Sequence, residues 1–383
     1  MKIAIYGAGN YGKYVFDEII NHECAKVSVI CWIDNFMDER RKSGLPVLTE
    51  KVFLESLKYN KIDAVVVAID RDRTAYEAAG SLLSHGFKAV YLAMPKGFVP
   101  KIPILNSEGD LGLLVKPYSF FKDIKPTLPY LEVRVNKHCN LKCKRCGNFS
   151  NLETNGELLD LNKFEDYLKQ LKKKFKSINC INLLGGEPLL NPQLPLYLEL
   201  IKEYFPERNR QITTNGLLIP KMSDELVDTI IKCDTVVGIS QYPPTRKSLE
   251  KIIDFLETHQ ISYAIGPQVT QFRKMINCKG ENADKAFARY ADEECICHVL
   301  EEGRIYICSL IKSVYDMQDY LGIHISESEL MNASIDLMSD DVDGWDIMQY
   351  LKQPTSLCRF CATDDEWVPW ETGQPRKEDW IVG

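Results

Sequence analysis

The sequence lacks the long apolar run that a membrane-spanning helix requires, and its N-terminus lacks the pattern of a secretory signal. It also lacks an excess of basic residues: 47 Lys and Arg stand against 54 Asp and Glu, which leaves a net charge of −7. This balance gives no reason to expect binding to nucleic acid or to an anionic membrane. We therefore expect a cytoplasmic protein without a membrane span that acts on a small molecule.

Cysteine, in contrast, is abundant. The chain has 13 cysteines among 383 residues, and a reducing compartment rarely contains disulfides. Binding of a metal or of an iron–sulfur cluster is therefore the simplest interpretation for the cysteines that are clustered. The scattered ones are by default buried apolar side chains, and they are Cys24, Cys31, Cys180, Cys233, Cys278 and Cys295.

The chain divides into three parts and a connector. Residues 1–98 alternate strands and helices, and residues 99–129, which are rich in Pro, Gly and Lys, predict a linker. Residues 130–285 predict a parallel α/β succession that forms a full or partial barrel. Residues 286–383 predict a small cysteine-rich module. The strands expected in the central part are 131–136, 178–184, 210–214, 235–240 and 262–266.

Three cysteines follow the first of these strands in the spacing Cys139-x3-Cys143-x2-Cys146. Three thiolates on one short loop can hold three irons of a cubane cluster and leave the fourth iron open to another ligand. A zinc site fits this loop poorly, because zinc usually takes two spaced pairs of cysteine or histidine. The loop therefore predicts an iron–sulfur cluster.

This loop resembles that of the radical S-adenosylmethionine (SAM) superfamily, and the resemblance covers about residues 130–270. Gly185-Gly186-Glu187-Pro188 follows a strand, where the family binds the amino group of SAM. The resemblance further implies cofactor contacts from Thr214, Asn215 and Ser240 at the next strand ends, although Ser240 also suits an ordinary strand end. It implies a partial (β/α)6 barrel, a SAM-binding 4Fe–4S cluster on Cys139, Cys143 and Cys146, and a reductant such as flavodoxin or ferredoxin.

One position departs from the family pattern. Arg145 stands where the family usually carries an aromatic residue beside the adenine of SAM. Phe149 is a candidate for the missing ring, and packing in the core is the alternative for this side chain.

A second set of cysteines follows the barrel. Cys297 and Cys308 flank a predicted hairpin whose turn at Glu302-Gly303 places them opposite each other, and Cys358-x2-Cys361 adds a second pair. Two such pairs also suit structural zinc. Behind a radical SAM core, however, they resemble the auxiliary-cluster tail called twitch or SPASM, which implies an auxiliary 4Fe–4S cluster. Cys295 fits the pairing less well than Cys297.

The N-terminal part carries Gly7-x-Gly9-x2-Gly12 between a strand and a helix, with Asp34 at the end of the second strand. This context predicts a Rossmann-like domain with a nucleotide site, in which the helix N-terminus holds phosphate. An NAD site, a purely structural domain and a nucleotide-sugar site are the alternatives. The segment resembles small Rossmann-like domains of enzymes of bacterial surface-polysaccharide biosynthesis, which favours the nucleotide sugar.

Glu132, Arg134 and Asn136 alternate with Val133 and Val135 along the first barrel strand. Alternate residues face opposite sides of a strand, so the polar set is expected to face the lumen. These three residues are candidates for catalysis, either by binding substrate hydroxyls or as a base. Strand ends solvated by water are the alternative.

These features together predict a radical SAM oxidoreductase. It would generate a 5′-deoxyadenosyl radical, take a hydrogen atom from a nucleotide-sugar alcohol and yield a ketone, with the auxiliary cluster accepting an electron. A radical SAM sugar epimerase and a radical SAM peptide-modifying enzyme are the alternatives. A non-catalytic regulator would leave the cysteine loop and Gly185-Gly186-Glu187-Pro188 unexplained.

Overall fold

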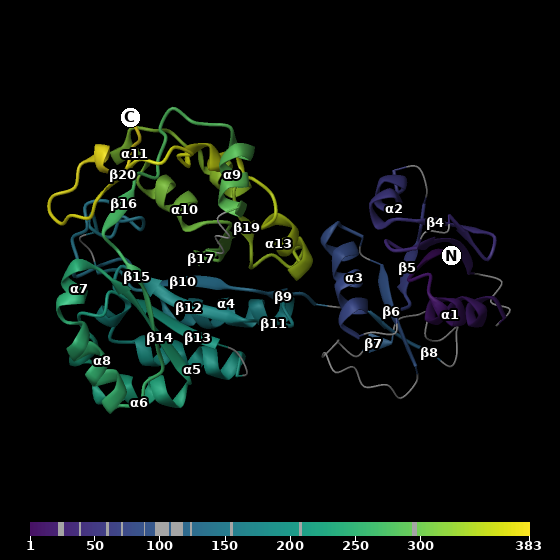
Figure 1. The fold of residues 1–383 in the computed structure, drawn as a ribbon, viewed down its shortest axis with the longest axis horizontal. Helices are drawn as coiled ribbons and strands as arrows, with labels where there is room; N and C mark the ends of the chain where they lie inside the picture. The colour runs from purple at the N-terminus through teal and green to yellow at the C-terminus, as the bar shows by residue number, and fades with distance from the viewer. Residues whose placement is uncertain are drawn as a thin grey trace. The chain divides into compact units, whose positions relative to one another are not determined.

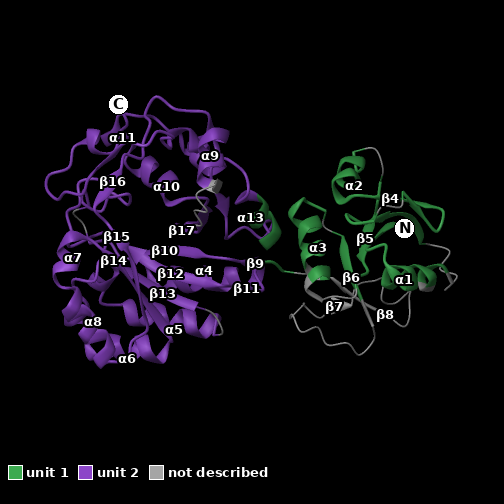
Figure 2. Cartoon of the chain, in the orientation of Figure 1, with its two compact units in different colours: residues 1–126, 344–349 green, residues 127–343, 350–383 purple. Residues whose placement is uncertain are grey.

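The computed structural model forms two compact units (Figure 2): Met1–Pro126 with Gly344–Gln349, and Thr127–Asp343 with Tyr350–Gly383. Among the described helices, none combines the length and the apolar character that a membrane span needs. The structure describes residues 1–21, 27–37, 40–58, 61–69, 72–87, 89–95, 107–108, 118–122, 125–153, 156–206, 209–292 and 297–383.

Unit 1 contains a sheet with the strand order β3-β4-β2-β1-β5-β6-β8-β7, whose centre is parallel. The strands are β1 (Lys2–Tyr6), β2 (Ser28–Ile33), β3 (Arg41–Lys42), β4 (Leu45–Leu48), β5 (Ala64–Val67), β6 (Val90–Pro95), β7 (Ser107–Glu108) and β8 (Tyr118–Lys122). The helices are α1 (Asn10–Asn21), α2 (Glu50–Ser56) and α3 (Asp72–Ser84). This arrangement agrees with the predicted Rossmann-like domain.

The glycine-rich turn connects β1 to α1 as the sequence predicts. Gly7 has a φ of +102°, a value that favours glycine. A Cβ atom at Gly12 would lie 1.8 Å from the carbonyl oxygen of Gly7, so only glycine allows the helix to start this close to the strand. The two glycines therefore have a structural role, whatever ligand the domain binds.

Two segments lie elsewhere than their predicted domains. Within the predicted linker 99–129, β8 pairs antiparallel with β6 and β7 pairs with β8, so both extend the sheet of unit 1. Helix α13 (Gly344–Tyr350), from the predicted C-terminal module, lies largely in unit 1. Its Trp345 packs on the unit 1 core where Gly80 has no side chain, and a Cβ there would lie 2.5 Å from the indole ring.

Unit 2 contains a second sheet with the order β15-β14-β13-β12-β10-β17-β18-β19. Figure 1 shows α5, α6 and α8 on one side of this sheet and α9, α10 and α11 on the other. The strands are β10 (Leu131–Asn136), β12 (Cys180–Gly185), β13 (Asn209–Thr214), β14 (Thr235–Gln241), β15 (Tyr263–Gln268), β17 (Val299–Glu301), β18 (Arg304–Tyr306) and β19 (Ile335–Asp336). The helices are α4 (Leu161–Lys174), α5 (Leu194–Tyr204), α6 (Asp224–Lys232), α7 (Pro243–Lys247), α8 (Leu249–Thr258), α9 (Ala283–Asp292), α10 (Ser309–Asp316), α11 (Gln318–Leu321) and α12 (Glu327–Asn332).

Local sequence accounts for these elements. Val133 and Val135 of β10 are buried, whereas Glu132 and Arg134 between them are half-buried on the other face, which confirms the predicted alternation. Helix α4 begins after Asp160, whose side chain accepts a hydrogen bond from the N–H of Lys163. Its last turn carries three lysines, which suit the negative end of the helix dipole.

The predicted hairpin is confirmed with its register. Glu301 of β17 pairs with Arg304 of β18, and Glu302 and Gly303 form the two-residue turn with φ values of 51° and 75°. Strand β17 also pairs in parallel with β10. The parallel sheet therefore continues into the predicted C-terminal module, and the expected border between residues 285 and 286 does not divide the sheet.

The rest of unit 2 consists of short elements. Strand β16 (Gln271–Arg273) pairs antiparallel with β20 (Trp367–Pro369), and β9 (Thr127–Leu128) pairs in parallel with β11 (Ser177–Ile178). The 3₁₀ helix η2 (Pro188–Leu190) follows Glu187, and η4 (Ser356–Phe360) contains Cys358. Two further 3₁₀ helices are η3 (Ile219–Lys221) and η5 (Lys377–Asp379).

Candidate iron–sulfur and cofactor site

One cavity in unit 2 gathers the three cysteines of the first loop with residues from the ends of three neighbouring strands. The cavity has a volume of about 150 Å³. It is lined by Cys139, Leu141, Cys143, Cys146, Gly147, Asn148, Leu184, Gly185, Gly186, Thr213, Thr214, Asn215, Ser240, Tyr242 and Phe272. The predicted cluster cysteines and most of the predicted SAM contacts therefore share one space.

Two of the three thiols of this loop, those of Cys139 and Cys143, are buried and receive hydrogen bonds. The sulfur of Cys139 accepts from the N–H of Leu141 at 3.4 Å, and that of Cys143 accepts from the indole N–H of Trp370 at 3.3 Å. Burial raises the pKa of Cys139 to about 11 and that of Cys143 to about 12. Since metals bind the thiolate, loading of this site releases protons. Three convergent thiols around a cavity suit an iron–sulfur cluster with one open iron.

The two glycines after β12 are required by the cysteine loop itself. A Cβ at Gly185 would lie 2.0 Å from the carbonyl oxygen of Asn136, and one at Gly186 would lie 2.0 Å from that of His138. The backbone N–H of Gly186 donates to the carbonyl of Asn136. The Gly-Gly pair thus lets the backbone after β12 pack directly on the start of the cysteine loop.

The carboxylate of Glu187 does not line this cavity and is fully buried. It accepts hydrogen bonds from the hydroxyl of Thr214 at 2.6 Å and from the N–H groups of Asn215 and Leu189 at 2.9 and 3.1 Å. Burial raises the pKa of this carboxyl group. The carboxylate thus joins two segments that border the cavity, and a contact between Glu187 and the ammonium group of SAM stays a prediction.

The other predicted cofactor contacts lie on the cavity wall. The side-chain amide of Asn215 donates to Asn140 at 2.7 Å and approaches the sulfur of Cys139 at 3.9 Å. Thr214 and Ser240 line the cavity from the ends of β13 and β14. These three residues remain candidates for binding the cofactor.

Two aromatic residues of the cavity were missed at the sequence level. Tyr242 directly follows β14, a strand-end position that could have identified it, whereas Phe272 arrives from β16 without a local signal. Phe149, the predicted substitute for the missing ring, lies elsewhere. It is buried and stacks on Trp380 with the ring centroids 4.8 Å apart, so core packing is the correct alternative.

The three predicted catalytic residues of β10 differ in their surroundings. The Arg134 guanidinium donates to Asn148, to Ser313 and to the backbone carbonyl of Ser309, and it pairs with Glu301 at 3.3 Å. The Asn136 amide donates to the backbone carbonyls of His138 and Glu187. Arg134 and Asn136 therefore hold parts of unit 2 together, which we did not predict.

Glu132 is the remaining candidate. The phenol of Tyr130 donates to its carboxylate at 3.3 Å, and burial raises the pKa of the carboxyl group. Tyr130 accepts a hydrogen bond from the side-chain amide of Asn182 at 2.6 Å, and Asn182 accepts from Thr213 at 2.9 Å. Since Thr213 lines the cysteine cavity, a continuous polar chain leads from that cavity to Glu132.

The far end of this chain lies beside the segment that carries the second cysteine set, because the N–H of Glu132 donates to the carbonyl of His298, next to Cys297, at 2.8 Å. The charge of Glu132 acts electrostatically on the thiol of Cys297, and Cys297 and Cys308 form a hydrogen bond with each other. The bond to Cys297, together with burial, raises the pKa of Cys308. The predicted pairing of Cys297 with Cys308 across the hairpin is therefore confirmed, while Cys295 lies outside the described residues.

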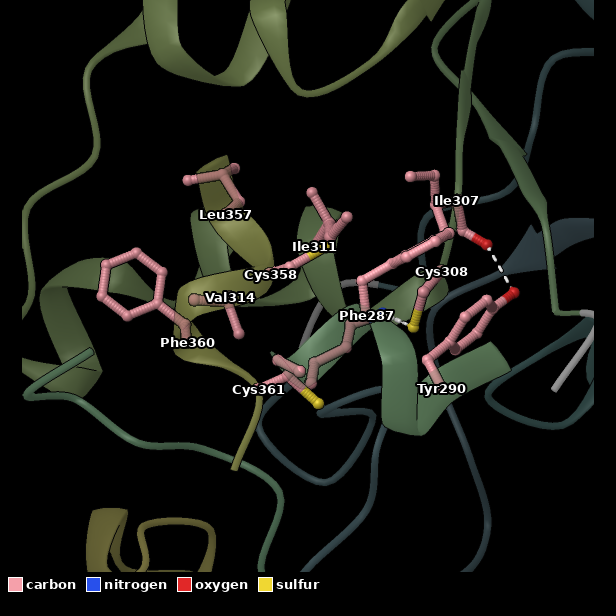
Figure 3. Close-up of a pocket in the computed structure, with 12 residues that line it drawn as sticks. Phe287, Tyr290, Ile307, Cys308, Ile311, Val314, Leu357, Cys358, Phe360 and Cys361 are labelled. Carbon is pink, nitrogen blue, oxygen red and sulfur yellow. Dashed lines mark hydrogen bonds between the residues drawn. The ribbon is translucent and has the colours of Figure 1, made fainter. Parts of the chain in front are cut away.

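The second pair lies beside Cys308 in a largely apolar pocket. Figure 3 shows Cys308, Cys358 and Cys361 in this pocket among the side chains of Phe287, Ile311, Val314, Leu357 and Phe360. The phenol of Tyr290 donates to the carbonyl of Ile307 at its edge. The fold thus brings both predicted cysteine pairs together from separate parts of the chain.

Neither cysteine set is arranged as a site for a single ion. Among the described residues, no three or more His, Cys, Asp and Glu side chains are positioned to hold one metal ion. What the structure establishes is which thiols share a pocket.

Unit 1 has a separate pocket at its glycine-rich turn. It has a volume of about 650 Å³ and is lined by Gly7, Gly9, Gly12 and Asp34, together with the exposed Phe36. The carboxylate of Asp34 accepts hydrogen bonds from the N–H groups of Ala8 and Phe36, both at 2.9 Å. All four residues that we predicted to bind a nucleotide therefore border one cavity.

A partial parallel barrel with three convergent cysteines at the ends of its strands defines an iron–sulfur protein. Residues 133–262 match the model of the radical SAM superfamily, and residues 2–74 match that of the PglD N-terminal domain. The chain is a radical SAM enzyme with a PglD N-terminal domain. The cofactors of such a domain are a 4Fe–4S cluster and SAM.

Relatives of known function are similar over part of the chain. A GTP 3′,8-cyclase of Helicobacter pylori is 30% identical over 142 residues, which are 34% of this chain and 44% of the relative. The FeMo cofactor biosynthesis protein NifB of Methanocaldococcus infernus is 31% identical over 130 residues, 32% of this chain and 42% of the relative. The chain thus spans less than half of the length of these two relatives.

Solved structures are similar at lower identity. BtrN in complex with AdoMet and 2-DOIA is 22% identical with a TM-score of 0.31, covering 37% of this chain and 57% of BtrN. The anSMEcpe structure with bound AdoMet and the Cp18Cys peptide is 16% identical with a TM-score of 0.31, covering 51% of this chain and 62% of that one.

Proposed function

We propose that the chain oxidises a secondary alcohol of a nucleotide-linked sugar to a ketone. The observation that carries this proposal is the polar chain from Thr213 through Asn182 and Tyr130 to Glu132, a residue whose backbone N–H binds the carbonyl of His298 beside Cys297. A substrate that reacts with SAM and then loses an electron has to lie between the two cysteine sites.

The bound cluster and SAM supply a 5′-deoxyadenosyl radical that removes a hydrogen atom from a substrate C–H bond. The residues of this chain have two further tasks. They must hold the substrate away from water, and they must accept the proton of the hydroxyl group on the same carbon. Glu132 is suited to the second task, because burial raises the pKa of its half-buried carboxyl group and no ion pair among the described residues neutralises it within hydrogen-bond distance.

The remaining electron needs an acceptor. Cys297, Cys308, Cys358 and Cys361 would hold an auxiliary 4Fe–4S cluster, which supplies such an acceptor. Loss of a hydrogen atom, a proton and an electron together leaves the ketone, so the reaction balances. The four thiols come as two pairs in apolar surroundings, which suit a cluster kept from solvent.

The N-terminal pocket supports a nucleotide as the carrier of the sugar. The N-terminus of α1 points backbone N–H groups at its glycine turn, where a diphosphate fits, and the exposed Phe36 offers a ring for a base. An NAD site is chemically redundant beside a radical centre. External electrons are expected from a flavodoxin or ferredoxin.

The proposal is tested by anaerobic incubation with SAM, a reductant and a panel of UDP-, GDP- and dTDP-sugars. Mass spectrometry should find one sugar that loses two daltons while one 5′-deoxyadenosine forms per product. A product of unchanged mass would contradict oxidation, and turnover of a peptide but of no sugar would contradict the substrate class.

Epimerisation is the second candidate, because a thiol lies next to the polar chain. The half-buried Cys180 acts electrostatically on Tyr130, so it lies near the proposed substrate region. A thiol there could return a hydrogen atom to the substrate radical from the opposite face. Cys180→Ala would then abolish an isomerisation, whereas it should leave an oxidation intact.

A further inference from the structure

The residues after the last cysteine pair lie on the first cysteine loop. In this C-terminal tail, defined as residues 367–383, the N–H of Gly373 donates to the carbonyl of Lys142 at 3.0 Å. The N–H of Lys144 donates in return to the carbonyl of Glu371 at 3.0 Å. The tail therefore pairs with the loop backbone between Cys139 and Cys146.

Side chains secure the same contact. Arg145 donates to the carbonyl of Pro369 and forms ion pairs with Asp379 at 3.4 Å and Glu371 at 3.8 Å. Its side chain is only 12% exposed, so these pairs are weakly screened by solvent. The residue that departs from the family pattern thus has a specific role, because it anchors the tail to the loop.

Trp380 holds the other end of the tail. Its indole is fully buried, donates to the backbone carbonyl of Cys146 at 2.8 Å and stacks on Phe149. Its own carbonyl accepts hydrogen bonds from the N–H groups of Met275 and Ile276, both at 3.0 Å. Anchors on both sides therefore fix the position of Trp370 between them.

Trp370 is the tail residue that contacts a cysteine sulfur. Its backbone N–H donates to the carbonyl of Thr270 at 3.0 Å, and its indole N–H donates to the sulfur of Cys143 at 3.3 Å. Its ring lies 6.1 Å from that of Tyr242, which lines the cavity. The indole is thus oriented from three directions toward one sulfur.

We propose that Trp370 tunes the SAM-binding cluster: its indole N–H stabilises the thiolate of Cys143 and raises the reduction potential of the cluster. This inference depends on one part of the proposed function, namely that Cys139, Cys143 and Cys146 hold the SAM-binding cluster. Reduction adds one negative charge to the cluster. A hydrogen-bond donor on a cluster sulfur stabilises the more negative form, and such bonds are among the factors that set these potentials.

The test compares Trp370→Phe with Trp367→Phe in the reconstituted full chain. Both remove one indole N–H from the same tail, but the side chain of Trp367 is 51% exposed and interacts with Asp365 instead of a cysteine. Redox titration followed by electron paramagnetic resonance measures the potential of the signal that changes on addition of SAM. Trp370→Phe should lower this potential, while Trp367→Phe should leave it at the wild-type value.

A second measurement keeps the inference testable if Trp370→Phe fails to load iron. Protein labelled with ¹⁵N in the tryptophan indoles should show a nitrogen coupling in the reduced, SAM-responsive signal. The coupling should persist in Trp367→Phe, because the exposed Trp367 has no contact with a cysteine among the described residues. An unchanged potential in Trp370→Phe, or the lack of this coupling in the wild type, would overturn the role of Trp370. If the wild type itself has no SAM-responsive signal, the cluster assignment fails as well.

Discussion

The hydroxyl of Thr214 donates to the buried carboxylate of Glu187 at 2.6 Å, which joins the end of β13 to the segment after β12. The same carboxylate binds the backbone N–H of Asn215. Thr214 and Asn215 line the cofactor cavity, whereas Glu187 does not. In this arrangement Glu187 positions the two residues beside it.

Glu187→Ala should destabilise unit 2 and weaken SAM binding as a consequence. The change leaves the buried N–H groups of Asn215 and Leu189 without an acceptor, which costs about 1–3 kcal/mol. Urea unfolding of the iron-free protein checks the loss, and calorimetry of the reconstituted protein checks the affinity for SAM. Glu199→Ala is the control, because Glu199 forms an exposed ion pair with Lys232 and should change stability by less than about 1 kcal/mol. Weaker SAM binding at unchanged stability would instead support a direct contact from Glu187.

Cys143→Ala should abolish reductive cleavage of SAM. The variant removes one of three thiols around the cofactor cavity but none of the second cysteine set. We expect no detectable 5′-deoxyadenosine by liquid chromatography, with the iron of the second set retained. The control is Cys278→Ala, because Cys278 is half-buried, whereas Cys233 is fully buried. The Cys278→Ala variant should cleave SAM normally. Cleavage by Cys143→Ala at the wild-type rate would disprove the site.

Replacing Cys358 and Cys361 together by alanine should lower the iron content by about four atoms per chain, on the cubane model. Net oxidation should stop, because the substrate radical loses its electron acceptor, while hydrogen abstraction still occurs in a first turnover. Iron analysis and single-turnover assays with deuterated substrate measure the two effects. Finding zinc in the wild type, with no loss of iron in the variant, would show that this cysteine set is structural.

Glu132→Gln should separate hydrogen abstraction from product formation. Gln keeps the shape and can still accept the hydrogen bond from Tyr130, but it cannot take a proton from the substrate. We expect 5′-deoxyadenosine without a matching amount of ketone, a change of at least about tenfold in their ratio. Glu165→Gln is the matched control, since Glu165 also binds a tyrosine phenol, that of Tyr204, at a more exposed position. An unchanged ratio in Glu132→Gln would exclude Glu132 as the base.

Two glycines of the N-terminal pocket should respond differently to valine. A Cβ at Gly9 meets no described atom within 4 Å, so Gly9→Val should fold normally and fill the pocket. Its affinity for a nucleotide sugar should fall by about tenfold or more, measured by calorimetry. A Cβ at Gly12 clashes with the carbonyl of Gly7, so Gly12→Val should instead lower the melting temperature. Tight binding of NADH that is lost in Gly9→Val would overturn the proposed sugar nucleotide.

The sequence alone determined the features that depend on spacing and on local backbone geometry. Cys139, Cys143 and Cys146 lie within one loop after β10. Their short spacing keeps them close together wherever the rest of the chain packs. The hairpin register followed from the two-residue turn at Glu302-Gly303, because the turn length fixes which residues face each other. Alternation along β10 and the glycine turn after β1 were predictable for the same local reason.

Only the tertiary structure decided which distant groups meet. Trp370, which directly follows β20, binds Cys143 although more than two hundred residues separate them, and Arg145 takes its partners from the same tail. The carboxylate of Glu187 accepts hydrogen bonds from Thr214 and Asn215, and helix α13 belongs largely to unit 1, far from it in the sequence. Side-chain partners of this kind depend on the packing of the whole unit, since a residue pattern specifies the face of a strand but not what covers it.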